Sequence, residues 1–582
     1  MKRKCLLESY LPDDTEQGVF RNIKQCLQVD RTMIMNQLKT PLDFFYYWEA
    51  TARDDIFLRQ SLGNGQWREF TWAEVGDRVR RLASFIHSRN LPSKSKIALW
   101  SANSADWLMV DLAIMLSGHV SVPLFPNQSV KTANFVLSEC DVSLMFVGNC
   151  GQEEKFTEWS RDDVALVAMH GCSVETQFEI EQIAESYEPE PSSPERTMDD
   201  LMTIVYSSGT TSLPKGVVHL FSAPAQVTPT IAQEFKISRE QGYRARLFSF
   251  LPLAHMAERA LVEFTGLYSN ACISFSAGLE SFNDEIVNVQ PTFFFAVPRL
   301  WDKFKTAIDS KIPPAEQDKM GVEQKQKVRC MLGLSQADMI LSSSAPLQPK
   351  VHEWYLKMGI VLREVYGMTE TFATGTGCFG DEMPESGNVG KSIGDIVDVK
   401  LSEENEVLMR SDSMMQGYYN AAEKTSEVLK DGWFYTGDCG IIDEKGNLTI
   451  TGRKGEEFKT AKGKFIHPVP LEKQFSGLPE IDQFIVIGQG LNQPVLLATR
   501  SELACLLPNS ELVARLTTYL SQVNATLSPY ERISHILICG SPWTIDNGML
   551  TPTLKYQRKN IENCFWIDAL KCCENTEEVI FV

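Results

Sequence analysis

Residues 206–216 read Tyr-Ser-Ser-Gly-Thr-Thr-Ser-Leu-Pro-Lys-Gly, a hydroxyl-rich loop between two short apolar runs, 201–205 and 217–220. Backbone N–H groups and hydroxyls in such a loop donate hydrogen bonds to phosphate oxygens, and a lysine adds a point charge. The loop is not a Walker A motif, because Lys215 is followed by Gly216 and not by Ser or Thr. The stretch predicts a polyphosphate-binding loop between two strands, with a polar surface loop as the simpler alternative. The expected phosphate contacts are Ser207, Ser208, Thr210, Thr211 and Lys215, with Gly209 allowing close backbone approach.

Length and composition limit the class of protein. The chain has 582 residues, too many for one compact core, so we expect at least two domains. A net charge of −19 disfavours nucleic acid as the main partner. No Cys-x-x-Cys or His-x-x-x-His pattern occurs, so we expect neither a zinc site nor a disulfide framework. The N-terminal apolar stretch is too short for a signal peptide, and residues 107–116 are too few and too polar for a membrane span. A soluble cytoplasmic protein is the expectation.

From about residue 71 the pattern alternates between helix and strand, which predicts an α/β fold with a doubly wound parallel sheet. Thr71 and Glu74 form a capping-box signature at the start of the first helix of this region. The expected strands of the first half are 96–100, 120–125, 141–147 and 164–169, with a helix at 104–116. Further buried strands are expected at 247–251, 292–297, 339–341 and 360–365. Each ends in a polar loop, and because ligands of open α/β sheets lie beyond the carboxyl ends of the strands, these loops should wall one site.

The character of the chain changes after about residue 390 to short β segments separated by turns. Segments 433–438 and 440–442 are expected as separate strands of a small β subdomain. Residues 451–456 are polar and contain glycine, which is typical of a hinge. We therefore predict a large N-terminal domain, 1–452, and a small mobile α+β C-terminal domain, 453–582.

Stretches along most of the chain resemble the adenylate-forming (AMP-binding, ANL) superfamily. Besides the loop 206–216, these are Val-Tyr-Gly-Met-Thr-Glu at 365–370, Phe-Tyr-Thr-Gly-Asp at 434–438, Gly-Arg at 452–453 and Leu-Thr-Pro-Thr-Leu-Lys at 550–555. Two further stretches, 251–259 and 290–301, look like the long-chain fatty acid–CoA ligase branch. The resemblance implies a two-step ligase that uses ATP, Mg²⁺ and coenzyme A: a carboxylate and ATP give an acyl adenylate and pyrophosphate, and a thiol then displaces AMP.

The resemblance also implies a role for each motif residue. Thr210, Thr211 and Lys215 would hold the outer phosphates, Thr369 would touch the α-phosphate, and Thr210 and Glu370 would hold Mg²⁺. Tyr366 would stack on adenine beside Gly367, Ser344 and Ala345, and Asp438 and Arg453 would contact the ribose. Lys555 would bridge the carboxylate and the nucleotide during adenylation. Each alone has a simpler structural interpretation: a core aromatic for Tyr366, a turn residue for Asp438 and a solvated lysine for Lys555.

The acyl and thiol sites are less sharply specified. His255 is as compatible with a satisfied core histidine as with a functional residue of the acyl site. Met256, Trp301 and Phe304 are candidate walls of an acyl tunnel. Lys462 and Gly463 resemble the pair that faces pantetheine in relatives, with a basic surface hairpin as the alternative. Gly455 stands where relatives usually carry Asp or Lys, two positions after the hinge arginine.

Other functions remain open at this stage. One is a fatty acyl-AMP ligase that loads a separate acyl carrier protein. A luciferase-like oxygenase or a reductase module fits less well. A protein of another class would bind the acyl group and the nucleotide without catalysis; Lys215, Glu370, Asp438, Arg453 and Lys555 argue against it and Gly455 is in its favour. The sequence also leaves open peripheral contact with a membrane and a homodimer.

Overall fold

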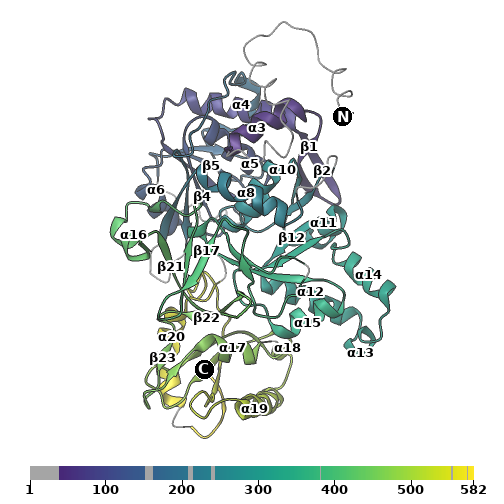
Figure 1. Ribbon diagram of the computed structural model, residues 1–582, viewed down its shortest axis with the longest axis vertical. Helices are drawn as coiled ribbons and strands as arrows, with labels where there is room; N and C mark the ends of the chain where they lie inside the picture. The colour runs from purple at the N-terminus through teal and green to yellow at the C-terminus, as the bar shows by residue number, and fades with distance from the viewer. Residues whose placement is uncertain are drawn as a thin grey trace.

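The structure is a computed structural model that describes residues 39–150, 161–207, 214–237, 243–380, 382–476, 478–551, 555–572 and 575–582. Three sheets with their helices form a large N-terminal part, and a small β sheet joins it to a compact C-terminal part at the bottom of the view (Figure 1). No helix in these ranges combines the length and apolarity that a transmembrane span requires.

The largest sheet has eight strands in the order β19-β9-β8-β4-β3-β5-β6-β7. Its bounds are β3 (Lys96–Trp100), β4 (Val120–Leu124), β5 (Leu144–Val147), β6 (Ala165–Ala168), β7 (Phe178–Glu179), β8 (Leu201–Ser207), β9 (Lys215–Leu220) and β19 (Gly417–Tyr418). Strands β3 to β8 are parallel, which confirms the predicted doubly wound pattern, whereas β9 and β19 add antiparallel strands at one edge. The expected strand 141–147 begins three residues late, because Asp141 has a φ of 52° in the turn before β5.

Two further sheets complete the N-terminal part. One has the order β10-β11-β1-β2, with β1 (Ile56–Gly63), β2 (Gln66–Thr71), β10 (Arg246–Ser249) and β11 (Cys272–Phe275). The other has the order β12-β13-β14-β15-β16, with β12 (Phe293–Ala296), β13 (Met339–Ser342), β14 (Leu362–Gly367), β15 (Gly375–Gly377) and β16 (Lys391–Ser392). Strands β12, β13 and β14 run parallel, so their carboxyl ends meet at one edge.

Helices cover these sheets. They are α3 (Pro41–Thr51), α4 (Trp72–Ser88), α5 (Ala105–Leu116), α6 (Val130–Glu139), α7 (Ile180–Ser186), α8 (Ser222–Glu234), α9 (Met256–Glu258), the π-helix η2 (Arg259–Phe264), α10 (Thr265–Ser269), α11 (Phe282–Val289), α12 (Pro298–Lys311), α13 (Pro314–Gln317), α14 (Val322–Met331), α15 (Pro349–Lys357), the 3₁₀ turn η3 (Thr369–Thr371) and α16 (Ala422–Val428). The capping box predicted at Thr71 and Glu74 opens α4. Every residue of α5 is buried, as expected for a helix at the centre of an α/β core.

The small β sheet has the order β17-β18-β21-β20, with β22 paired to β21. Its strands are β17 (Asp398–Leu401), β18 (Glu406–Arg410), β20 (Leu429–Lys430), β21 (Trp433–Ile442) and β22 (Leu448–Arg453). The prediction of separate strands at 433–438 and 440–442 was wrong. The two segments are one strand, and an irregularity in the pairing with β22 between Cys439 and Gly440 interrupts its register.

The C-terminal part is an α+β unit. Its four-stranded sheet, β25-β26-β27-β28, comprises β25 (Ile481–Ile487), β26 (Val495–Arg500), β27 (Ile536–Cys539) and β28 (Val579–Phe581). The helices are α17 (Pro468–Phe475), α18 (Glu502–Cys505), α19 (Asn509–Thr526) and α20 (Arg558–Cys572), and a hairpin joins β23 (Phe458–Lys459) to β24 (Phe465–Ile466). The predicted domain boundary at 452/453 falls at the end of β22, and it stays a prediction.

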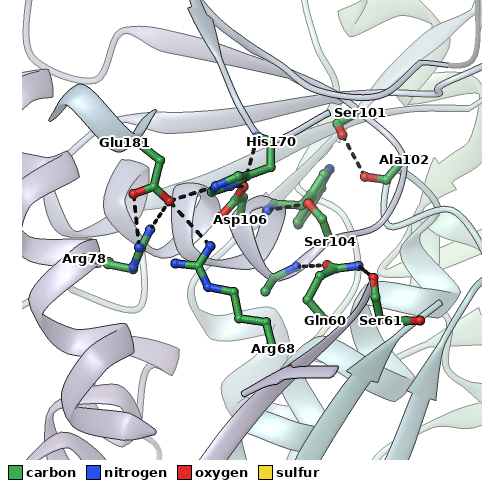
Figure 2. Close-up of polar contacts among 12 residues, drawn as sticks. Gln60, Ser61, Arg68, Arg78, Ser101, Ala102, Ser104, Asp106, His170 and Glu181 are labelled. Carbon is green, nitrogen blue, oxygen red and sulfur yellow. Dashed lines mark hydrogen bonds and ion pairs between the residues drawn. The ribbon is translucent and has the colours of Figure 1, made fainter. Parts of the chain in front are cut away.

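A charged cluster of Arg68, Arg78, Asp106, His170 and Glu181 braces the first turn of α5 (Figure 2). The ring of His170 lies between two carboxylates: Nδ1 contacts Asp106, and Nε2 lies 2.8 Å from Glu181. Glu181 is also paired with Arg78 at 3.1 Å. The hydrogen bond to Asp106 raises the pKa of His170 above its ordinary value. The cluster therefore joins β2, α4, α5 and α7 through His170 and Glu181.

This cluster predicts a pH-dependent contribution to stability. Because the folded-state pKa of His170 is raised above 6.5, its stabilisation is complete below that value and is lost as pH rises through the folded pKa. We expect His170→Gln to lower the free energy of unfolding near pH 6 and to have less effect near pH 9. The difference should stay below about 1 kcal/mol, because the ring is partly exposed and water screens the pairs. Urea unfolding at both pH values measures it. His87→Gln, at a ring with the single carboxylate partner Glu190, is the control, and equal pH dependence in both variants would contradict the prediction.

Candidate active site

The loops that follow β10, β13 and β14 converge, as the sequence predicted for polar loops at the carboxyl ends of parallel strands, whereas β12 contributes Phe295 of the strand itself and none of its following loop. They enclose a cavity of about 30 Å³. The cavity is lined by His255, Ala257, Leu261, Phe295, Ser343, Ser344, Val365, Gly367, Met368 and Ala373. This volume is close to that of one water molecule, so a larger ligand requires side chains to move apart.

Asp438 lies at the centre of the second group of predicted residues. Its Oδ2 accepts a hydrogen bond of 2.7 Å from the hydroxyl of Tyr366, and its Oδ1 accepts one of 2.8 Å from Nε of Arg453. The register of β21 against β22 places Asp438 directly opposite Arg453. The side chain of Asp438 is 13% exposed. The structure thus brings together a half-buried carboxylate, an aromatic ring and a guanidinium, a set suited to a ribose and a purine.

We predict that Asp438→Ala raises the apparent KM for ATP by about 10- to 100-fold, because a charged partner of a ligand contributes roughly 1.5–3 kcal/mol. ATP titration of the adenylation rate measures this. The exposed Asp398, which pairs with Arg410 on the same sheet, offers the control variant Asp398→Ala. An unchanged KM in the Asp438 variant would remove this residue from the site.

The backbone around the site is tightly constrained. A Cβ at Gly367 would lie 2.7 Å from the carbonyl of Ala373, so this position requires glycine. Ser344 has a φ of 74°, and Phe372 and Ala373 also have positive φ values. Non-glycine residues in this region carry strain and cluster at functional sites. The exposed Ala345 follows Ser344 at the same edge.

Thr369 and Glu370 form the turn η3 directly after β14. Oε1 of Glu370 accepts a hydrogen bond of 2.9 Å from the hydroxyl of Tyr418, and Nζ of Lys215 lies 4.7 Å from the centre of the same tyrosine ring. Tyr418 therefore links the two residues expected to hold the cation and the phosphates. Sequence reasoning missed it, because only the pairing of β19 with β9 places it there.

Lys555 reaches this site from the C-terminal part. The residue keeps exposed surface, but its charged end interacts with Arg453, Asp438 and Glu370. Burial of the ammonium group and the nearby Arg453 lower the pKa of Lys555, while the two carboxylates act in the opposite direction. The backbone N–H of Lys555 donates to Oγ1 of Thr551 at 3.0 Å. The charge of this C-terminal lysine thus interacts with those of both carboxylates of the site.

His255 lines the cavity and also interacts with Lys555. Its Nδ1 accepts a hydrogen bond of 3.1 Å from the backbone N–H of Ala257, so the proton of the neutral ring is on Nε2. Burial, and then the charge of Lys555, lower its pKa to about 4. His255 is therefore a neutral hydrogen-bond donor near pH 7, which suits contact with an anionic carboxylate.

Other predicted residues fall elsewhere. Ser208, Gly209, Thr210 and Thr211 lie outside the described residues, while Ser207 ends β8 and Lys215 begins β9. Met256, Trp301 and Phe304 are packed in hydrophobic cores and line no part of the 30 Å³ cavity. Their role as acyl-tunnel walls is not supported, because the rings of Trp301 and Phe304 pack against Phe294, Tyr355 and Phe282.

Lys462 and Gly463 lie on the exposed turn between β23 and β24. Gly463 has a φ of 74°, and its N–H donates to the carbonyl of Thr460 at 2.9 Å. The hydrogen bonds of this hairpin to other elements go to Gln489 and Leu491 of the same C-terminal part. Gly455, directly after β22, has a φ of 82° and open space around it, which fits a pivot between the domains.

The described residues could bind Mg²⁺ only together with a bound nucleotide. Among them, no group of three or more His, Cys, Asp and Glu side chains is arranged to hold a metal ion. Glu370 supplies one oriented carboxylate, and Mg²⁺ in nucleotide sites is held by one or two carboxylates together with phosphate oxygens and water. The donor set therefore fits a cation that arrives with the nucleotide. Thr210, the other expected ligand, is among the residues not described.

Comparisons with known proteins agree with this geometry. Residues 45–419 match the family model of AMP-binding enzymes, and residues 458–566 match that of the AMP-binding enzyme C-terminal domain. The long-chain-fatty-acid–CoA ligase FadD15 of Mycobacterium tuberculosis is 26% identical over 575 residues, covering 88% of this chain and 94% of the relative. Long chain acyl-CoA synthetase 2 of Arabidopsis thaliana is 26% identical over 584 residues, covering 85% of this chain and 86% of the relative.

Solved structures share the fold. The adenylation domain of a carboxylic acid reductase from Segniliparus rugosus, in complex with AMP and a co-purified carboxylic acid, superposes with a TM-score of 0.77 at 18% identity. That match covers 96% of this chain and 100% of the other. ATP-bound MatB from Rhodopseudomonas palustris gives a TM-score of 0.72 at 18% identity, covering 90% of this chain and 99% of the other. These likenesses confirm the predicted α/β fold with a large N-terminal and a smaller C-terminal domain.

Proposed function

Because the chain belongs to the family of AMP-binding enzymes, which form adenylates, we propose that it joins a long-chain fatty acid to coenzyme A in two ATP-dependent steps. The observation that carries this proposal is the hydrogen-bonded set of Asp438, Tyr366 and Arg453, with the charge of Lys555 close enough to affect His255 and to interact with Asp438 and Glu370. Such a set is suited to hold a nucleoside, with a cation nearby for a reacting carboxylate. Similarity to long-chain acyl-CoA ligases supports the choice of acid.

In the first step, a fatty carboxylate oxygen attacks the α-phosphorus of ATP, and pyrophosphate leaves. Lys555 orients the carboxylate and stabilises negative charge on the phosphoryl oxygens, where positioning and electrostatics dominate catalysis. Asp438, with Tyr366 and Arg453, fixes the nucleoside end. Lys215 and Glu370 hold the phosphate end, and Mg²⁺ bound there neutralises phosphate charge. His255 donates from Nε2 to the acyl carboxylate.

In the second step, the thiol of coenzyme A attacks the acyl carbonyl, and AMP leaves. The turn with Lys462 and Gly463 is exposed on the C-terminal part, so this step requires that part to rotate about residues 453–456. Gly455 at a φ of 82° supplies the backbone freedom for such a pivot. In the proposed cycle, one arrangement of the domains places Lys555 at the active site for adenylation, and the other places Lys462 there for thioester formation.

The choice of a long chain has an energetic consequence. Each buried methylene contributes about 0.8 kcal/mol, so affinity should rise steeply with chain length once a tunnel is open. Since the cavity seen here holds only about 30 Å³, binding of a long acid must displace side chains around it, such as Leu261 and Met368.

The test is ATP–pyrophosphate exchange with acids from acetate to about C18, followed by addition of either coenzyme A or a holo acyl carrier protein. We expect exchange to peak with long chains and acyl-CoA to form on adding coenzyme A. If the acyl group is transferred to the carrier protein but not to coenzyme A, the acceptor is a protein and the proposal of coenzyme A is wrong. Binding of ATP without exchange for any acid would contradict an enzymatic role.

A further inference from the structure

His219 is a fully buried histidine on β9, the strand that begins with Lys215. Its Nε2 lies 2.7 Å from the backbone carbonyl of Thr369. Burial lowers the pKa of His219 to about 4, so the ring is neutral near pH 7 and donates its Nε2 proton to that carbonyl. Strand and turn are 150 positions apart in the sequence, and this hydrogen bond joins them directly.

The other ring nitrogen indicates why this position holds a histidine. Nδ1 of His219 is buried and has no hydrogen-bond partner among the described residues. A buried acceptor without a partner costs about 1–3 kcal/mol, which an apolar residue of similar size would avoid. His219 lies between the apolar residues Val218 and Leu220 on this strand. The cost is offset only by what the other nitrogen does, and that nitrogen contacts only Thr369.

The turn that His219 contacts is strained, and many of its other hydrogen bonds lie within the turn itself: the N–H of Phe372 donates to the carbonyl of Thr369 at 3.2 Å, and Oγ1 of Thr374 donates to the carbonyl of Thr371 at 2.6 Å. Thr369 opens η3, and Phe372 and Ala373 that follow it have φ values of 55° and 58°. Phe372 packs edge-on against the His219 ring, with centroids 5.2 Å apart. Glu370 is held separately, by Met415 at its carbonyl and by Tyr418 at its carboxylate. Among the described residues, His219 is thus the side chain from another element that bonds to Thr369.

We propose that His219 is a positioning residue for adenylation, which fixes the turn of Thr369 and Glu370 relative to Lys215 so that both ends of the site meet Mg²⁺–ATP in register. Every second residue of a strand lies on the same face, so Lys215 and His219, four positions apart, point to the same side of β9. One strand therefore carries the phosphate-binding cation at its start and the support of the cation-binding turn four residues later. This inference rests on the proposed function, because it assigns Lys215 and Glu370 to the nucleotide.

The test compares His219→Leu, which removes the donor at similar volume, with His219→Gln, whose side-chain amide can donate to the Thr369 carbonyl. His352→Leu is the matched control: His352 is also buried and its Nε2 lies 2.9 Å from a backbone carbonyl, that of Leu362, away from the turn. Isothermal titration with ATP, with and without Mg²⁺ and without any acid, measures nucleotide affinity apart from catalysis. Pyrophosphate exchange and thioester formation from prepared acyl adenylate measure the two half-reactions.

We expect His219→Leu to weaken ATP binding about 3- to 10-fold in Mg²⁺ and much less without it, the range for one lost hydrogen bond. Pyrophosphate exchange should fall at least as far, thioester formation should change little, and His219→Gln should recover most of the loss. His352→Leu should lower the melting temperature without this Mg²⁺-dependent loss. If His219→Leu does not fold, His219→Asn, too short to reach the carbonyl, should show the same pattern.

Equal Mg²⁺–ATP affinity in the wild-type protein and in the variant that lacks the donor would overturn the inference. So would parallel loss of both half-reactions matched by His352→Leu, which would indicate a general structural role. The proposed function fails separately, if the wild-type protein binds Mg²⁺–ATP but exchanges no pyrophosphate with any fatty acid; the affinity difference then still decides the role of His219. A wild-type protein that binds no ATP overturns both.

Discussion

Lys555→Ala is expected to lower the rate of acyl-adenylate formation by about 10³-fold or more, a loss of roughly 4 kcal/mol of transition-state stabilisation. The reason is electrostatic: the charge of Lys555, in the C-terminal part, interacts with those of Asp438 and Glu370. Replacement by alanine removes the charge that orients the acyl carboxylate. ATP–pyrophosphate exchange measures the loss.

The second half-reaction separates catalysis from folding. Because we propose that Lys555 acts in adenylation and not in thiol transfer, the variant should still form thioester from prepared acyl adenylate and coenzyme A. Lys559→Ala, at an exposed residue in the first turn of α20, is the control and should affect neither step. Equal loss of both half-reactions in the Lys555 variant would contradict its assigned role.

Arg259→Leu is expected to have the largest effect on stability, about 3–5 kcal/mol. Arg259 is fully buried in η2, where Nε donates to Glu263 at 2.9 Å, Nη1 donates to Thr203 at 2.8 Å and Nη2 contacts Asp111. Removing the guanidinium leaves two buried carboxylates without a counter-charge. Urea or thermal unfolding measures the change.

The pH dependence of this loss has a definite sign. Burial already raises the pKa of Glu263, and loss of the Arg259 charge, which lowers it, should raise that pKa further. A raised folded-state pKa means that the native carboxyl binds its proton more tightly, so the variant should recover stability as pH falls. Arg59→Leu, at a partly exposed pair with Glu69, is the control and should cost less than about 1 kcal/mol. A variant of Arg259 as stable as that control would contradict the argument.

The sequence predicted the parts of the fold that depend on local signals. The capping box at Thr71 and Glu74 and the buried helix after Ser104 follow from residue type and spacing, and both are present. Segment 433–442 was divided wrongly, because Gly437 and Gly440 are typical of turns whereas the observed β21 absorbs them within an irregular strand. Glycine alone does not distinguish a turn from a bulge.

Some residues of the candidate site could likewise be predicted from the sequence, and others could not. Asp438 and Arg453 could be paired from their motifs, and the register of β21 and β22 places them opposite each other. Tyr418 and His219 could not be found, because their contacts with Glu370 and Thr369 depend on strand pairing and on a turn far away in the chain. Trp301 was a candidate wall of an acyl tunnel; the structure shows it fully buried against Tyr355, and the wall role stays a prediction. An aromatic residue type in a sequence predicts that the side chain is buried, but it does not predict whether that side chain packs against protein or against a bound ligand.

The central claim is that a carboxylate oxygen attacks the α-phosphorus of ATP in this site. The most direct measurement uses a fatty acid labelled with ¹⁸O in both carboxylate oxygens, with ATP, Mg²⁺ and coenzyme A, and analyses the products by mass spectrometry. We predict that AMP carries one ¹⁸O atom and that pyrophosphate carries none, because the bridging oxygen of the acyl adenylate leaves with AMP. Unlabelled AMP, or ADP with ¹⁸O in inorganic phosphate, would contradict the account.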